Sequence, residues 1–96
     1  MTIETRLVRA HVELAVTPED EHGVKAVPLA RFGAYEVRLV EFSQISLDSA
    51  FDFYLELFDY NEGIAIDGGG ANDLEEAVRF VEDLISRAQE LSKKTN

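Results

Sequence analysis

The sequence predicts an α+β fold: an antiparallel four- to five-stranded meander sheet followed by one long C-terminal α-helix packed on one face. Short segments with apolar residues at alternate positions fill the first two thirds of the 96 residues. A stretch with apolar residues every three or four positions ends the chain. Turns rich in proline, glycine and charge separate the segments, and no linker or repeat is present, so we expect residues 1–96 to form a single compact domain.

The first expected strand covers about residues 5–16. Its even positions from 8 to 16 are all apolar, whereas polar residues such as Arg9 and Glu13 occupy odd positions. This alternation is typical of a half-buried strand. The proline and the charges of residues 17–23 end it, because proline cannot donate to a strand ladder and charged residues resist burial.

Four further strands are expected along the middle of the chain. The segment of about 24–31 contains Pro28, which belongs at a sheet edge or at a bulge because it cannot donate to a ladder, and we expect an edge strand. The segment 35–43 begins with alternation and then becomes apolar on both sides, which favours a central strand. The segment 50–59 alternates between large apolar side chains and mixed ones, and a turn ending in glycine then leads into a short strand at 63–67.

The helix is expected over about residues 73–93. Asn72 or Asp73 can act as its N-cap, and an acid three residues after each can complete a capping box and favour the positive end of the helix dipole. Basic residues lie near its end, where cations are favoured. The apolar stripe consists of Leu74, Ala77, Val78, Val81, Leu84, Ile85, Ala88 and Leu91.

One helix is too narrow to cover the expected sheet. Strands about 4.8 Å apart make a four- to five-stranded sheet roughly 19 to 24 Å wide, whereas a helix with its side chains is about 10 to 12 Å across. We therefore expect a homodimer that covers part of the remaining apolar surface. Tyr54 and Phe58, opposite the expected core face, are the candidate contact residues; the alternative is that they lie singly on a partly exposed face.

The charge is negative and unevenly distributed. Nine Lys and Arg residues oppose nineteen Asp and Glu residues, which argues against nucleic acid or an anionic membrane as a partner. Residues 1–47 carry five basic and seven acidic residues, and residues 48–96 carry four and twelve, so eight of the ten net negative charges lie in the second half. A basic protein is the partner that such a surface favours. The candidate carboxylates are Asp52, Glu56, Asp59, Glu62 and Asp67.

No pattern of catalytic, cofactor-binding or metal-ligating residues stands out. The chain has no cysteine, and His11 and His22 have no companion ligands nearby in the sequence. The glycines of residues 66–73 lack the lysine and the spacing of a phosphate loop, so we interpret them as a sharp reversal before the helix. We expect no enzyme activity, no cofactor and no metal.

These observations predict a small cytoplasmic, non-enzymatic protein-interaction module that is homodimeric and has an acidic docking surface. The chain has no leader pattern and no apolar stretch that could span a membrane. One alternative is an inhibitor or immunity-type protein whose carboxylates imitate nucleic-acid charge. Such a mimic requires a track of carboxylates without interspersed Arg or Lys. Another alternative is a small-molecule binder with a pocket between the helix and the sheet.

Overall fold

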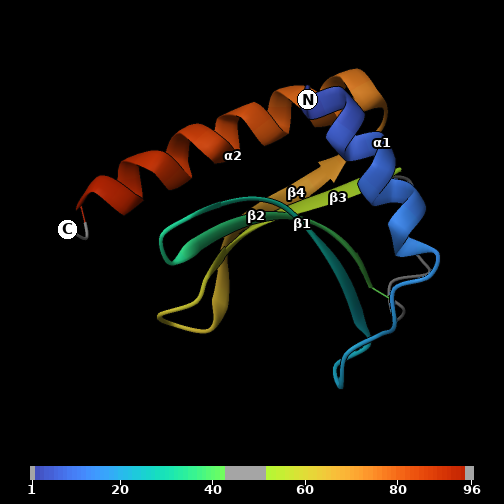
Figure 1. Ribbon diagram of the computed structural model, residues 1–96, viewed down its shortest axis with the longest axis horizontal. Helices are drawn as coiled ribbons and strands as arrows, with labels where there is room; N and C mark the ends of the chain where they lie inside the picture. The colour runs from blue at the N-terminus through green and yellow to red at the C-terminus, as the bar shows by residue number, and fades with distance from the viewer. Residues whose placement is uncertain (1, 43–51, 95–96) are drawn as a thin grey trace.

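The computed structural model describes residues 2–42 and 52–94. The strands form one antiparallel sheet in the order β1-β2-β3-β4, so each strand pairs only with its neighbours in the chain. Both helices lie above one face of this sheet (Figure 1). The α+β class and the antiparallel meander are therefore confirmed. The elements are α1 (Ile3–Leu14), β1 (Val24–Phe32), β2 (Tyr35–Phe42), β3 (Phe53–Asp59), β4 (Ile64–Ala71) and α2 (Leu74–Lys94).

The N-terminal segment is a helix, so the prediction of a strand over 5–16, and with it the prediction of a single helix, is wrong. Thr2 caps α1: its Oγ1 accepts a hydrogen bond of 3.1 Å from the backbone N–H of Thr5. Leu7, Ala10 and Leu14 are buried at helical spacing, and Ile3 packs partly buried one turn before them.

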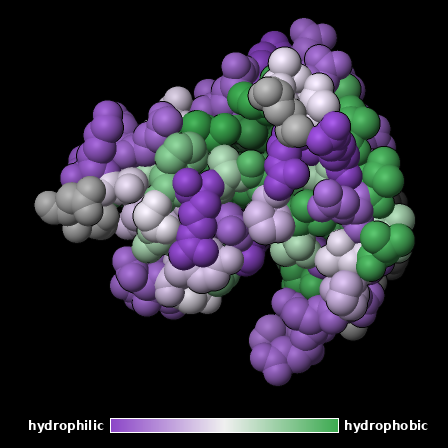
Figure 2. Space-filling model, viewed as in Figure 1, coloured by the Kyte–Doolittle hydropathy of each residue, from purple (hydrophilic) through white to green (hydrophobic). Residues whose placement is uncertain are grey.

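The valines that suggested a strand lie mostly in solvent. Val8 and Val12 on α1 are 47% and 67% exposed, and Val16, beyond its end, is 83% exposed. Apolar side chains are visible at the surface over α1 in Figure 2. Two of the five alternating apolar positions thus belong to the outer side of a helix, where β-branched residues are less favourable than in strands but are tolerated.

The C-terminal helix agrees with the prediction. The backbone N–H of Glu76 donates to Oδ1 of Asp73 at 2.8 Å, which identifies Asp73 as the N-cap of α2. The helix occupies Leu74–Lys94 instead of the expected 73–93. Its buried residues are Ala77, Val81, Leu84 and Ala88, all from the predicted stripe.

The glycines lie inside β4 instead of in a loop, which corrects the expected end of that strand at residue 67. Gly68 pairs with Glu56 and Gly69 with Leu55. A Cβ on Gly68 would lie 2.9 Å from the carbonyl oxygen of Leu55, and one on Gly69 would lie 2.9 Å from Cε2 of Phe80. Glycine is needed here because the neighbouring backbone and the ring on α2 approach closely.

The other expected strands are present with small changes of boundary. The strand β1 extends one residue beyond the predicted 24–31, and it is an edge strand with a register shift between Pro28 and Ala30, as its proline indicated. Residue 43 of one prediction and residues 50–51 of another lie outside the described residues. The turn before β4 has Gly63 at a φ of 71°, as expected from its sequence.

The core lies between the sheet and the two helices. The side chains of Val37 and Leu39 on β2 and of Leu55 and Leu57 on β3 are fully buried there. Because side chains alternate along a strand, the intervening residues of β2 and β3 point to the opposite face of the sheet. Within residues 2–42 and 52–94, no helix is both long enough and apolar enough to cross a membrane.

Candidate functional site

The face of the sheet opposite the helices carries a group of charged and aromatic side chains. The register places Glu36 beside Phe58, Arg38 beside Glu56 and Val40 beside Tyr54. Figure 2 shows a hollow beneath the sheet, between the β3–β4 hairpin and the turn that precedes β1. We call this surface the helix-free face and define it by Arg31, Glu36, Arg38, Val40, Phe42, Tyr54, Glu56, Phe58 and Tyr60.

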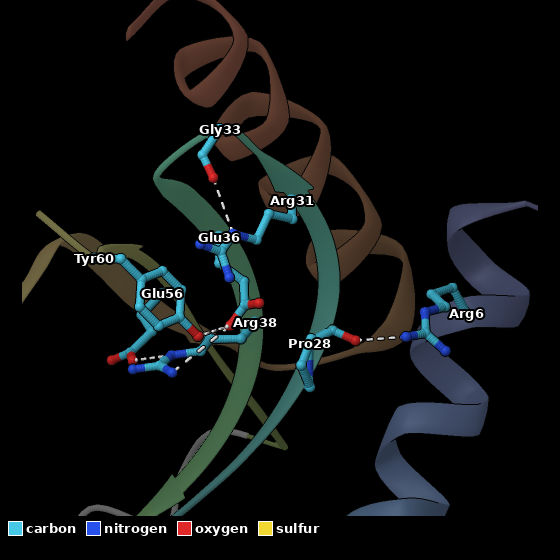
Figure 3. Close-up of polar contacts among 8 residues, drawn as sticks. All are labelled: Arg6, Pro28, Arg31, Gly33, Glu36, Arg38, Glu56 and Tyr60. Atoms are coloured by element: carbon cyan, nitrogen blue, oxygen red, sulfur yellow. Dashed lines mark hydrogen bonds and ion pairs between the residues drawn. The ribbon is translucent and has the colours of Figure 1, made fainter. Parts of the chain in front are cut away.

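Arg38 holds two carboxylates at the centre of this face (Figure 3). Its Nε donates to Oε1 of Glu56 at 2.7 Å, and its Nη1 lies 3.7 Å from Oε1 of Glu36. The hydroxyl of Tyr60 donates to the same Glu36 oxygen at 2.8 Å. The side chains of Arg38 and Glu56 are only 17% and 10% exposed, so these charges are largely desolvated and depend on one another.

Two adjacent aromatic rings on the same surface lie between two guanidinium groups. The Cζ of Arg31 lies 4.1 Å from the centroid of the Tyr60 ring, and the Cζ of Arg38 lies 3.9 Å from that of Phe58. Tyr60 and Phe58 meet edge to face with their centroids 5.0 Å apart. Stacked planar groups lose little conformational freedom on binding, so this row is a rigid platform.

A second aromatic pair lies along the same strands. Phe42 and Tyr54 contact each other edge to face, with centroids 5.2 Å apart and an interplanar angle of 84°. Beside them Val40 is buried although it faces away from the helices. The helix-free face thus has an apolar end around Val40 and an ionic end around Arg38.

The Tyr60 phenol is held in its neutral form. Desolvation raises its pKa, and the hydrogen bond to the Glu36 carboxylate raises it further. Tyr60 therefore stays protonated at neutral pH and donates to Glu36. A general acid or base works best when its pKa lies near the operating pH, so this phenol is poorly suited to proton transfer.

The candidate carboxylates predicted from the sequence do not all lie together. Glu56 is on the helix-free face with Tyr54 and Phe58, but it is paired with Arg38. Asp59 is buried at the end of β3, where its Oδ1 accepts from the N–H of Asn61 at 2.8 Å and caps the hairpin turn. These two carboxylates have structural roles.

The remaining candidate carboxylates lie away from the centre of this face. Asp67 has its Oδ2 3.4 Å from Nη1 of Arg87 on α2, while Asp52 and Glu62 are exposed. Arg38 and Arg87 are therefore interspersed among the candidate acids. This arrangement does not favour a mimic of nucleic-acid charge, which requires an uninterrupted track of carboxylates.

The sequence reasoning missed Arg31, Glu36, Arg38 and Tyr60. A signal was available for two of them: Glu36 and Arg38 alternate with Tyr35, Val37 and Leu39, which places both on the side away from the core. Their ionic partner lies on another strand, and its identity depends on the β2–β3 register.

The two histidines do not form a metal site with other residues. The ring of His11 packs against that of Phe53 with centroids 5.1 Å apart, and exposed His22 lies beside Glu21. His11 lies in the segment 5–16 that was expected to be a strand, and it is instead on α1. In the part of the chain that the structure describes, no group of three or more His, Asp or Glu residues is arranged to hold a metal ion.

A separate pocket of about 250 Å³ lies between α1, β1 and α2. Its lining includes Ile3 and Leu7 from α1, Leu29 from β1 and Ile85 from α2. Arg6 also lines it and donates from Nη2 to the carbonyl oxygen of Pro28 at 2.6 Å (Figure 3). The pocket therefore lies on the opposite side of the sheet from the helix-free face.

Comparison with known proteins identifies no relative of this chain. The chain matches no protein-family model, no curated protein and no solved structure. Conclusions about its function therefore rest on its own residues.

Proposed function

We propose that this chain is a small, cytosolic, non-enzymatic protein-interaction module that forms a homodimer through the helix-free face. The observation that carries the proposal is the row of Arg31, Tyr60, Phe58 and Arg38 on a sheet face that neither helix covers. Aromatic and arginine side chains are the residue types most enriched at the centres of protein interfaces.

Charge favours a second copy as the partner at this face. The net charge of the chain is -10, so two copies repel each other at most of their surface. On the helix-free face, Arg31 and Arg38 balance Glu36 and Glu56, and the charges sum to zero. Two copies can therefore approach here without bringing unbalanced negative charges together.

Shape and area set the expected strength of this contact. A twisted sheet is a saddle, so two copies can pack face to face with their strands crossing at a large angle. Four strands spaced by about 4.8 Å and eight residues long at about 3.3 Å each span roughly 500 Å² per copy. Because Glu36, Val40 and Glu56 on this face are already buried within one chain, the total of roughly 1,000 Å² is an upper limit. It falls at or below the lower limit for specific interfaces, so we expect a weak dimer with a dissociation constant of tens of micromolar or more.

Sedimentation velocity over a range of about 1 µM to 1 mM chain tests the proposal. The wild-type protein should shift from the mass of one 10.7 kDa chain to twice that mass as concentration rises. Replacing half-buried Tyr54 by aspartate adds an unpaired charge at the contact, and the dissociation constant of Tyr54→Asp should increase at least about tenfold.

The matched control is Val12→Asp, which introduces the same charge on the exposed side of α1. This variant should dimerise like the wild type. A wild-type protein that remains monomeric at about 1 mM would contradict the proposal, and so would dissociation caused by Val12→Asp but not by Tyr54→Asp.

A further inference from the structure

The pocket between α1, β1 and α2 combines apolar walls with one positive charge. Ile3, Leu7, Leu29, Val81 and Ile85 supply aliphatic side chains from all three elements. Thr2 and Arg6 complete the lining, and Arg6 is the only ionisable residue among these seven. Mostly apolar walls with a few placed polar groups are typical of small-molecule sites.

The Arg6 guanidinium has a fixed position in this pocket. Its hydrogen bond to the carbonyl oxygen of Pro28 connects the Arg6 side chain on α1 to the backbone of β1 (Figure 3). A guanidinium has five N–H donors, so this one bond leaves donors for a second acceptor. Arginine binds a carboxylate with two parallel, charge-assisted hydrogen bonds, which are stronger than neutral ones.

The pocket volume limits the size of a ligand. A cavity of about 150 Å³ holds the six non-hydrogen atoms of benzene, or about 25 Å³ for each, so a pocket of about 250 Å³ accommodates roughly ten non-hydrogen atoms. The walls offer aliphatic contacts without a ring to stack on, so a flexible aliphatic chain fits their chemistry. A carboxylate can remain at Arg6 while the chain lies between the helices.

We propose that this pocket binds a short aliphatic carboxylate of about six to eight carbons, with its carboxylate on Arg6. Charge complementarity selects this ligand over an aliphatic amine or a neutral alcohol, because the only charge in the lining is positive. The binding is independent of the contact between copies proposed above, since the pocket and the helix-free face lie on opposite sides of the sheet.

The test uses the full chain and three probes of equal length: octanoate, 1-octanol and octylammonium. Ligands of about ten non-hydrogen atoms bind with dissociation constants near 0.1 to 1 mM at ordinary ligand efficiency, a range that NMR titration of backbone amides measures. Octanoate should shift the amides of residues 2–7, 29, 81 and 85. The alcohol should bind at least about tenfold more weakly, and the amine more weakly still.

Two variants and a control locate the site. Arg6→Gln should weaken octanoate binding about tenfold and leave octanol binding unchanged, and the retained octanol binding shows that this variant is folded. Arg9→Gln removes the same charge from an exposed position of α1 and should bind octanoate like the wild type. Ile85→Trp should fill the pocket and abolish binding of both ligands.

Three outcomes would overturn the proposal. The first is no amide shift with about 10 mM octanoate. The second is an Arg6→Gln variant that binds octanoate as tightly as the wild type. The third is octylammonium binding more tightly than octanoate, which would mean that the overall negative charge of the chain outweighs Arg6.

Discussion

Arg38 is the residue on which the helix-free face depends. Its guanidinium contacts the carboxylates of Glu56 and Glu36 and also covers the ring of Phe58. Because these carboxylates are largely buried, removal of Arg38 leaves two charges that water can reach only in part. At the residue scale, one side chain therefore joins the ionic and the aromatic parts of the surface.

Replacing Arg38 should cost far more stability than replacing an arginine of an exposed ion pair. We expect Arg38→Met to lower the free energy of unfolding by about 3 kcal/mol, the usual effect of breaking a buried pair. Arg87→Met is the control, because Arg87 and Asp67 are 54% and 36% exposed and such pairs contribute less than about 1 kcal/mol. Urea denaturation measures both, and equal losses would contradict this role of Arg38.

At the element scale, β4 depends on the absence of side chains at two positions. A methyl group on Gly68 would meet the backbone carbonyl of Leu55, which the sheet holds in place. A methyl group on Gly69 would meet the edge of the Phe80 ring, which can rotate away. The two positions therefore differ in how far their neighbours can move.

Gly68→Ala should be the more destabilising of the two substitutions. We expect a loss of about 2 to 3 kcal/mol for Gly68→Ala and about 1 kcal/mol or less for Gly69→Ala, within the range known for overpacking. Both are measured by urea denaturation. The interpretation of β4 would fail if Gly69→Ala were the more damaging variant.

The elements predicted correctly from the sequence show a single spacing of apolar residues and have clear sequence signals at their ends. For α2, the three- to four-residue spacing and the Asp73 cap point to the same structure. Residues 5–16 fit two periods, because Val8 and Val12 complete an alternating pattern while Leu7 and Leu14 complete a helical one. The choice between them depends on α2 and the sheet, which bury only the helical set, and local sequence does not contain that information.

The candidate site was predictable only in part, for a similar reason. Alternation alone placed Tyr54 and Phe58 opposite the core face, and the register agrees. The pairing of Arg38 with Glu56 depends on how β2 and β3 align, and a shift of one residue would separate them. The sequence suggested a pocket only between the C-terminal helix and the sheet, and the pocket at Arg6 could not be predicted, because it requires α1 to be a helix.

At the scale of the whole molecule, the net charge of -10 should affect stability. Like charges repel most strongly in the compact state, and salt screens this repulsion, with a Debye length of about 30 Å at 0.01 M and about 3 Å at 1 M. The melting temperature should therefore rise between 10 mM and 500 mM sodium chloride. Circular dichroism measures this change, and a fall over the same range would show that attractive ion pairs outweigh repulsion.

The order of elements along the chain determines when the core can close during synthesis. Each hairpin of the sheet consists of neighbouring strands, so the strands can pair as they leave the ribosome. The first helix cannot complete its packing then, because α2, against which it packs, is made after all four strands. At about 5 to 20 residues per second, the 21 residues of α2 take roughly 1 to 4 s to synthesise. The parts of α1 and of the sheet that α2 covers therefore stay exposed in the nascent chain for seconds, and in this interval the chain is most exposed to aggregation and to chaperones.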